Sequence, residues 1–177
     1  MKSLDVGCGP GVLPQGWVGM DAHTPDDSGP ITRHDMTDIP WPWSDDTFEQ
    51  VAFRHSLEHV ALDQALLVLK EAWRVLRPGG VLQIEVPELE SVCRWFLDSD
   101  ERDRWGAWNQ TSPARWLFGQ QHGNGQYHLA GFTQQRLRAL LGEVGGANGM
   151  VMGVPHGYVP IMVLRATMMK PPNAMKS

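Results

Sequence analysis

The sequence predicts a single α/β domain on a mostly parallel sheet, with a terminal antiparallel hairpin and a shortened first helix. Three observations predict this fold class. Short apolar segments precede and follow one long helical segment, a glycine-rich turn directly follows the first of them, and two more lie close together near the end. At 177 residues and 19.8 kDa, the chain has room for one domain.

The composition excludes several classes of protein. Fifteen Lys and Arg against twenty Asp and Glu give a net charge of −5, which disfavours a dedicated nucleic-acid binder. No apolar run approaches the roughly 20 residues that span a bilayer, and no secretory signal opens the sequence. Two cysteines, Cys8 and Cys93, are too few for a disulfide framework. We therefore expect a cytoplasmic protein without membrane contact.

The predicted strands of the N-terminal half are short apolar segments bounded by Gly, Pro or Asp. They cover residues 2–6, 17–20, 31–35 and 48–53. Between the first two, Pro10, Pro14 and Gly16 leave space for one helical turn at most. Since these strands are apolar throughout, we expect a sheet that is covered on both faces.

The C-terminal part begins with a predicted helix over residues 62–76, which stops at Pro78-Gly79-Gly80. The remaining elements follow in chain order. They are a strand over 81–86, an irregular insert over 88–130, a helix over 134–143 capped by Thr133, and hairpin strands over 151–154 and 158–166. We expect one domain over 1–169 and a disordered tail over 170–177.

Several polar or glycine-rich segments follow predicted strands. The glycine turn, Asp21, Asp35, His55 and Pro87 all stand in this position. Because ligands of parallel sheets bind at the carboxyl ends of the strands, we expect these residues to meet at one edge.

The glycine turn has the spacing G-x-G-x-G at residues 7, 9 and 11. The dinucleotide fingerprint G-x-G-x-x-G needs a glycine at position 12, where Val12 stands, so NAD or FAD binding is disfavoured. The turn alone is also compatible with a purely structural role.

Five motifs in order carry a resemblance to a known family. They are Asp5-x-Gly-x-Gly-x-Gly11, Asp21, Asp35-Met36, Leu57-Glu58-His59 and Arg74-Val-Leu-Arg-Pro-Gly-Gly80. The segment over about residues 3–90 resembles class I S-adenosylmethionine-dependent methyltransferases, most of all the small type 11 enzymes. The resemblance implies a Rossmann-like sheet and S-adenosyl-L-methionine as cofactor, with S-adenosyl-L-homocysteine as product. It also implies in-line methyl transfer to a small-molecule acceptor.

The resemblance also implies cofactor-binding residues. They are Asp5, Gly7, Cys8, Gly9, Asp21, Ala22, Asp35, Met36, Arg54 and His55. Asp5 would lie near the amino group of the cofactor, and Asp21 would accept hydrogen bonds from both ribose hydroxyls. Asp35 would lie at the adenine amino group. A turn-capping role for Asp35 remains an alternative.

The segment His55-Ser-Leu-Glu58-His59 matches the zinc-protease signature H-x-x-E-H. Two His on one helix with Glu58 as base would make a zinc hydrolase, but a third ligand in a helical frame is missing. By the resemblance, His55 instead borders the methionine moiety and the acceptor, and no metal is expected. A zinc hydrolase remains the minor alternative.

The insert over 88–130 is predicted to bind the acceptor. It contains four Trp and four Arg, namely Trp95, Trp105, Trp108, Trp116, Arg94, Arg102, Arg104 and Arg115. Trp116 and Tyr127 are the candidate substrate contacts, while His55, His122 and His128 are the candidate catalytic residues. Packing by the Trp side chains and a surface position for the His residues are the alternatives.

Two functions therefore remain besides the minor zinc alternative. The first is methyl transfer from S-adenosylmethionine to a small-molecule acceptor. The second is a catalytically silent S-adenosylmethionine-binding subunit that needs a partner. The sequence leaves open a homodimer or a partner subunit.

Overall fold

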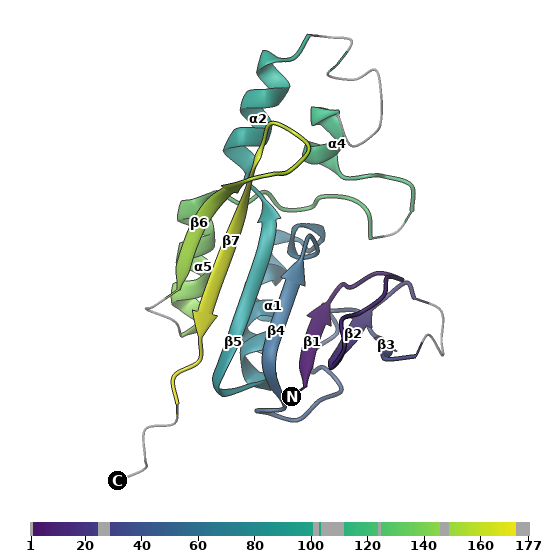
Figure 1. The fold of residues 1–177 in the computed structure, drawn as a ribbon, viewed down its shortest axis with the longest axis vertical. Coiled ribbons are helices and arrows are strands. Elements are labelled where there is room, and N and C mark those ends of the chain that lie inside the picture. The colour runs from purple at the N-terminus through teal and green to yellow at the C-terminus, as the bar shows by residue number, and fades with distance from the viewer. Residues whose placement is uncertain are drawn as a thin grey trace.

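A computed structural model describes residues 2–24, 29–100, 103, 112–123, 125–145 and 149–172 (Figure 1). Its centre is a seven-stranded sheet in the order β3-β2-β1-β4-β5-β7-β6. The strands are β1 (Ser3–Val6), β2 (Trp17–Asp21), β3 (Ile31–Arg33), β4 (Phe48–Arg54), β5 (Leu76–Pro87), β6 (Met150–Pro155) and β7 (Met162–Met169). Strands β1 to β5 pair in parallel, and β7 runs antiparallel to both β5 and β6. The predicted sheet with its terminal hairpin is confirmed.

The core lies between the sheet and two helices. Helix α1 (Leu62–Val75) packs against β5, and α5 (Gln134–Val144) packs against α1, β6 and β7. In the register of the sheet, Val6 of β1 stands opposite Met20 and Phe53, and all three are fully buried. Burying an apolar side chain of this size stabilises the fold by roughly 1.5–3 kcal/mol. These contacts hold the carboxyl ends of β1, β2 and β4 side by side.

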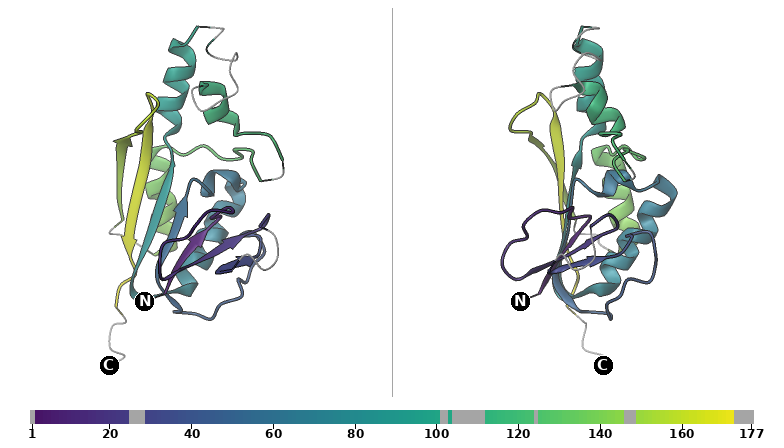
Figure 2. Two further views of the ribbon diagram at one scale, coloured as in Figure 1. Left: turned by 45° about the vertical axis from the view of Figure 1, so that its right-hand side comes forward. Right: turned by 90° about the vertical axis from the view of Figure 1, so that its right-hand side faces the viewer.

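Helices α1 and α5 lie on one side of the sheet (Figure 2). In the part of the chain that the structure describes, no helix packs on the opposite face, although all four residues of β1 are buried. The reason is local, because the linker between β1 and β2 forms only turns, one of them closed from Trp17 N to Pro14 O (3.1 Å). The sequence predicted a shortened first helix. In the structure, the segment between β1 and β2 contains no helix.

The boundary between α1 and β5 differs from the sequence prediction. The helix ends at Val75, and the Pro78-Gly79-Gly80 segment lies inside β5 instead of stopping the helix. Leu76 is already extended and pairs with Phe48, after which the register shifts, and Gly79 adopts a φ of 76°. Pairing with β4 therefore decides where the helix ends.

The insert over 88–130 is not irregular throughout, as the sequence had suggested. It contains α2 (Leu89–Asp98) and α4 (Pro113–Phe118), and the side chain of Glu88 caps α2 by accepting from Glu90 N and Ser91 N. Glutamate is not a common capping residue, which is why the composition did not reveal this start. Four predicted insert residues lie outside the described residues, namely Arg102, Arg104, Trp105 and Trp108.

Two further boundaries differ near the C-terminus. The last strand begins at Met162, because residues 156–161 form a turn closed by His156 N and Ile161 O (2.9 Å). Lys170 belongs to the folded part, since its amino group donates to the Asp46 carboxylate at 2.8 Å.

The predicted cap of α5 by Thr133 is confirmed, because the Thr133 side chain accepts a hydrogen bond from Arg136 N. None of the described helices combines the length and apolarity that a membrane crossing requires.

Candidate functional site

Two cavities adjoin at the carboxyl ends of the parallel strands. The first, the strand-end cavity, has a volume of about 690 Å³ and is lined by residues that follow β1, β2, β3 and β4. The second, the histidine cavity, has a volume of about 370 Å³. Its lining residues are His55, Glu58, His59, Arg115, Trp116, Gly119, Gln120, His128, His156 and Tyr158. Both volumes fall within the about 300–1,000 Å³ that is usual for small-molecule sites.

The glycine turn forms one wall of the strand-end cavity. Gly7 has a φ of 69°, and a Cβ there would lie 2.5 Å from Cβ of Ser56, so only glycine fits. Ser56 is held in place because its hydroxyl donates to the carbonyl oxygen of Val6 at 2.6 Å. At Gly9 a Cβ would meet nothing within 4 Å, which leaves the backbone open towards a ligand. The turn therefore lets a ligand approach the main chain closely.

Asp21 stands at the end of β2 on the wall of the same cavity. Its Oδ2 accepts a hydrogen bond from Gly9 N at 2.9 Å, and its Oδ1 accepts one from His23 N at 2.8 Å. These bonds fix the carboxylate, and each oxygen keeps a second lone pair for a hydroxyl donor. Ala22 also lines the cavity.

Asp35 and Met36 line the cavity from the segment after β3. Oδ1 of Asp35 accepts bonds from both the amide and the hydroxyl of Thr37, each at 2.8 Å. This is the turn-capping role that the sequence left open, and it leaves Oδ2 without an assigned bond within the described residues. The position therefore combines a local turn with a place on the cavity wall.

Asp5, Cys8 and Arg54 line neither cavity. Asp5 is buried and pairs with Arg54 at 2.8 Å; burial raises the pKa of Asp5, and the Arg54 guanidinium only partly offsets this. Burial, with the nearby carboxylates of Asp21 and Asp5, raises the pKa of the Cys8 thiol to about 11. A Cβ at Gly19 would lie 2.4 Å from this thiol. The predicted contact of Asp5, Cys8 and Arg54 with the cofactor stays a prediction.

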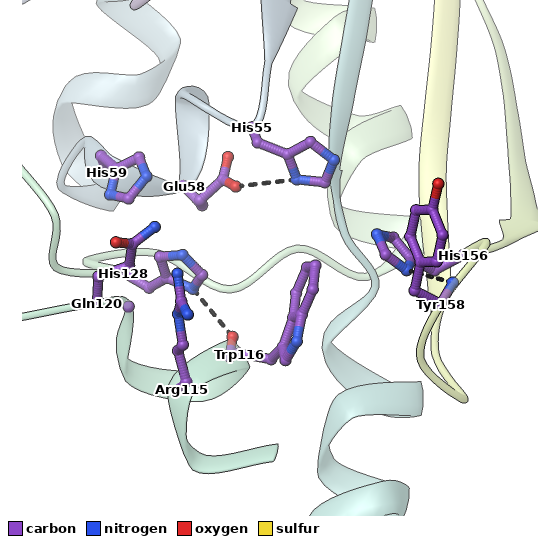
Figure 3. Close-up of a pocket in the computed structure, with 10 residues that line it drawn as sticks. His55, Glu58, His59, Arg115, Trp116, Gln120, His128, His156 and Tyr158 are labelled. Atoms are coloured by element: carbon purple, nitrogen blue, oxygen red, sulfur yellow. Dashed lines mark hydrogen bonds and ion pairs between the residues drawn. The ribbon is translucent and has the colours of Figure 1, made fainter. Parts of the chain in front are cut away.

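His55 lines the histidine cavity next to Glu58 (Figure 3), and its other ring nitrogen faces Glu85. Its Nδ1 is 3.5 Å from Oε1 of Glu58, and its Nε2 is 3.2 Å from Oε1 of Glu85. Burial opposes protonation, but the two carboxylates outweigh it and raise the pKa of His55 above its usual value. Both ring nitrogens of His55 are engaged by carboxylates, and this geometry argues against His55 as a general base.

The rings of His59 and His128 are in edge-to-face contact on the cavity wall, with centroids 5.0 Å apart. Nδ1 of His59 bonds the carbonyl oxygen of Tyr127 at 2.9 Å, and Nδ1 of His128 bonds that of Trp116 at 2.9 Å. A carbonyl oxygen only accepts, so each Nδ1 carries the proton and each Nε2 keeps a lone pair. Burial lowers the pKa of His128, which favours its neutral form.

Glu58 joins this pair from the 3₁₀ turn η1 (Leu57–His59). It is only 2% exposed, and its Oε2 is buried without a hydrogen-bond partner among the described residues. Its carbonyl oxygen accepts bonds from the amides of Leu129 (2.8 Å) and Ala130 (3.1 Å). Because Leu129 and Ala130 directly follow His128, these two hydrogen bonds hold His128 next to Glu58 and His59.

Aromatic rings form another wall of the histidine cavity. Trp116 of α4 and His156 of the turn between β6 and β7 have ring centroids 5.0 Å apart, and Tyr158 follows at 6.0 Å from His156. Figure 3 shows Arg115 reaching into the same cavity from α4. The wall suits a flat molecule, and the guanidinium suits an anionic group on it.

The structure separates the remaining sequence candidates. His122 is exposed and lines neither cavity, and Tyr127 contributes its carbonyl oxygen while its side chain lies largely outside. The zinc-protease geometry is contradicted, because His55 and His59 do not share a helix face. Sequence reasoning missed His156 and Tyr158, although two ring residues in a predicted hairpin near the sheet edge were a usable signal.

Residues 4–84 match the model of a family described as a methyltransferase domain. A search among curated proteins found no match. Among solved structures, the 1,6-didemethyltoxoflavin-N1-methyltransferase of Burkholderia thailandensis, solved with 1,6-didemethyltoxoflavin and S-adenosylhomocysteine, is similar with a TM-score of 0.64 and 20% identity. That comparison covers 96% of this chain and 70% of the other. Residues 4–84 thus match a methyltransferase-domain family, and the described chain has the fold of S-adenosylmethionine-dependent methyltransferases.

Two further methyltransferase structures support the same fold. A possible histamine N-methyltransferase of Thermotoga maritima has a TM-score of 0.60 at 18% identity, covering 94% of this chain and 82% of the other. A complex of a Haloferax volcanii methyltransferase activator with a candidate methyltransferase is similar with a TM-score of 0.59 at 16% identity. That comparison covers 96% of this chain and 82% of the other. In this chain, the segment with the family match contributes most of the strand-end cavity, whereas Trp116, His128 and His156 lie beyond it.

Proposed function

We propose that this protein is a methyltransferase, and that it transfers a methyl group from S-adenosylmethionine in the strand-end cavity to a small, flat acceptor in the histidine cavity. The observation that carries the proposal is the shared wall. His55, His59 and Gln120 line both cavities, so a ligand in one would lie next to a ligand in the other. Catalysis by alignment requires this proximity.

The strand-end cavity provides groups for each part of the cofactor. Gly7 and Gly9 would allow the methionine and ribose portions to approach the backbone, and the lone pairs of Asp21 would accept the ribose hydroxyls. Oδ2 of Asp35 would accept a hydrogen bond from the adenine amino group, and the Met36 side chain would pack against the adenine ring. When bound, S-adenosylmethionine supplies a sulfonium methyl: the acceptor's lone pair bonds its carbon, the carbon–sulfur bond breaks, and sulfur keeps the bonding pair.

The acceptor side is formed by the insert over about 88–130 and by the turn between β6 and β7. Trp116, His156 and Tyr158 would stack on a flat ring, and Arg115 would pair with an anionic substituent. The B. thailandensis neighbour binds a small molecule, 1,6-didemethyltoxoflavin, which agrees with an acceptor of this size. This assignment keeps the whole described chain as one domain with an acceptor-binding insert.

A hydroxyl acceptor must lose its proton during the transfer. Nε2 of His128 is the best-placed base, because its Nδ1 proton is held by the carbonyl of Trp116 and its pKa is lowered by burial. The proton of the acceptor would move to this nitrogen. His55, held between Glu58 and Glu85, would instead keep the positive charge that balances these carboxylates.

Calorimetry with S-adenosylhomocysteine, followed by a screen of flat phenols and aromatic amines for release of that product, tests the proposal. Trp116→Ala should raise the KM of an acceptor found in this way, with little change in cofactor affinity. Leu67→Ala, an exposed position on α1, should change neither. Absence of S-adenosylhomocysteine binding, or methylation of only protein or nucleic acid, would contradict the proposal.

One observation favours the second candidate, a cofactor-binding subunit that needs a partner. The side chains of Met150, Met152 and Met169 on β6 and β7 are 62%, 44% and 58% exposed. The H. volcanii neighbour was solved as a complex with a methyltransferase activator. Turnover by the isolated, monomeric chain would eliminate this candidate, whereas cofactor binding without turnover of any acceptor would favour it.

A further inference from the structure

We propose that Glu58, His59 and His128 bind a divalent transition-metal ion at the histidine cavity, where the ion would hold the acceptor's oxygen. The sequence pattern did not suggest this set, because His128 is 69 positions beyond His59 and the H-x-x-E-H letters point to His55 instead. The role of the ion in methyl transfer rests on the proposed function. Its binding does not, and can be measured by itself.

The three side chains already bring their ligand atoms together. One nitrogen from each His and one carboxylate oxygen lie within 4.8 Å of one another. With bonds of about 2.1 Å from zinc to nitrogen, the ligand atoms of a tetrahedral site lie about 3.4 Å apart. Modest rotations of the imidazole rings would therefore close the set around an ion. Two His and one carboxylate leave a coordination position for water or an acceptor.

The second observation is the outer contact of each imidazole. Nδ1 of His59 and Nδ1 of His128 are both engaged by backbone carbonyls, those of Tyr127 and Trp116. Metal-binding His side chains typically donate their other nitrogen in this way, which fixes the tautomer and the direction of the free lone pair. Nε2 is thus the nitrogen left for a ligand in each ring, and both residues line the same cavity.

The third observation is the orphaned oxygen of Glu58. A carboxylate oxygen that is buried without a partner loses its hydration and gains nothing in return. Glu58 is 2% exposed, and its Oε2 has no partner in the described ranges. His55 approaches only the other oxygen, at 3.5 Å. A cation between Glu58, His59 and His128 would give this buried oxygen a partner and balance its charge.

The chemistry of the donor set selects the ion. Imidazole nitrogen with one carboxylate suits Zn²⁺, Mn²⁺, Co²⁺ or Fe²⁺, whereas Ca²⁺ and Mg²⁺ prefer oxygen ligands alone. Glu85, on the far side of His55, is already paired with Arg165 at 2.7 Å, so the carboxylate available to an ion is that of Glu58. Arg115 is the opposing charge on the cavity wall, and we expect it to meet an anionic group of the acceptor.

A bound ion would change how the acceptor loses its proton. Coordination of a hydroxyl to a divalent ion lowers the pKa of that hydroxyl, so the proton can leave to solvent near neutral pH. The oxygen's lone pair then bonds the methyl carbon, and the sulfur keeps the electrons of the broken carbon–sulfur bond. His128 would act as a ligand in this scheme and not as the base.

The experiment begins with the full chain freed of metal by a chelator and then titrated with Zn²⁺ or Co²⁺ by calorimetry. We expect one ion per chain and a Co²⁺ absorption band in the visible. His59→Ala, His128→Ala and Glu58→Gln should each weaken binding by at least about 100-fold. His156→Ala is the matched control, because it lines the same cavity outside the ligand set and should leave the affinity unchanged.

Folding and function are separated from metal binding by two further measurements. Each variant is accepted only if its urea midpoint shows that it is folded, and a conservative His→Gln variant at the same position replaces any His→Ala variant that is not. No stoichiometric ion, or equal binding by the ligand variants and the wild type, would overturn the metal site. Turnover by the metal-free protein would then leave the proposed function intact with His128 as base. An ion that binds without methylation of any acceptor would support the site and count against the proposed function.

Discussion

The strand-end cavity and the histidine cavity share a wall but are built in different ways. Backbone turns after parallel strands dominate the first, and Gly7, Gly9, Asp21 and Asp35 stand within a short stretch of chain. Side chains from three distant segments, 55–59, 115–128 and 156–158, form the second. A cavity made of backbone follows from strand order, whereas one made of side chains depends on how loops are fastened. The two should therefore respond differently to substitution.

The largest difference is expected for His128→Ala. Removing this imidazole should lower turnover by roughly 10²–10⁴-fold, whether it serves as base or as metal ligand. Because His128 does not line the strand-end cavity, the affinity for S-adenosylhomocysteine should stay within about twofold. The comparison of kcat with calorimetric Kd tests this separation, with His122→Ala as the exposed control. A parallel loss of cofactor affinity would show that the two cavities are not independent.

Gly7→Ala is the corresponding test of the strand-end cavity. The new Cβ would lie 2.5 Å from Ser56 in a backbone conformation with φ 69°. We expect a cost of about 2–4 kcal/mol in the free energy of unfolding, together with weaker cofactor binding. Gly123→Ala should be neutral, since a Cβ there meets nothing within 4 Å. Urea denaturation measures both variants, and equal stability would refute the close approach.

Asp21→Ala should have a smaller effect that is confined to the cofactor. Each hydrogen bond to a carboxylate contributes about 1.5–3 kcal/mol, so the Kd for S-adenosylhomocysteine should rise tenfold or more. Asp63→Ala, an exposed position in the first turn of α1, serves as the control. An unchanged Kd in folded Asp21→Ala would remove this residue from the ribose site.

The smallest effect concerns a buried contact away from both cavities. Glu71 accepts bonds from Arg74 and from the Trp41 amide, and these, led by Arg74, hold the pKa of Glu71 below its ordinary 4.5. Its contribution to stability is therefore present above pH 4.5 and is lost as the pH falls through the lowered value. Glu71→Gln should flatten the decrease of the urea midpoint between pH 5 and pH 3. Glu143→Gln, exposed on α5, should keep the wild-type slope.

Much of the fold could be predicted from local signals. The apolar strands β1, β2 and β4 appear at their predicted places, and Asp21 and Gly7 stand where the order of strands implied. Interactions of this kind involve neighbours in sequence or adjacent strands, so residue type and spacing carry them. The sequence by itself determined the sheet, its terminal hairpin and the position of the strand-end cavity.

Only the tertiary structure decided the histidine cavity. His128 meets Glu58 and His59 because backbone amides of the following residues bond the carbonyl of Glu58, a contact across about 70 positions of chain. The same holds for the orientation of His55 between Glu58 and Glu85, and for the end of α1 at the pairing with β4. Such contacts depend on loop closure and on hydrogen bonds between segments that are distant in sequence. The residues involved have no local spacing pattern from which the contacts could be predicted.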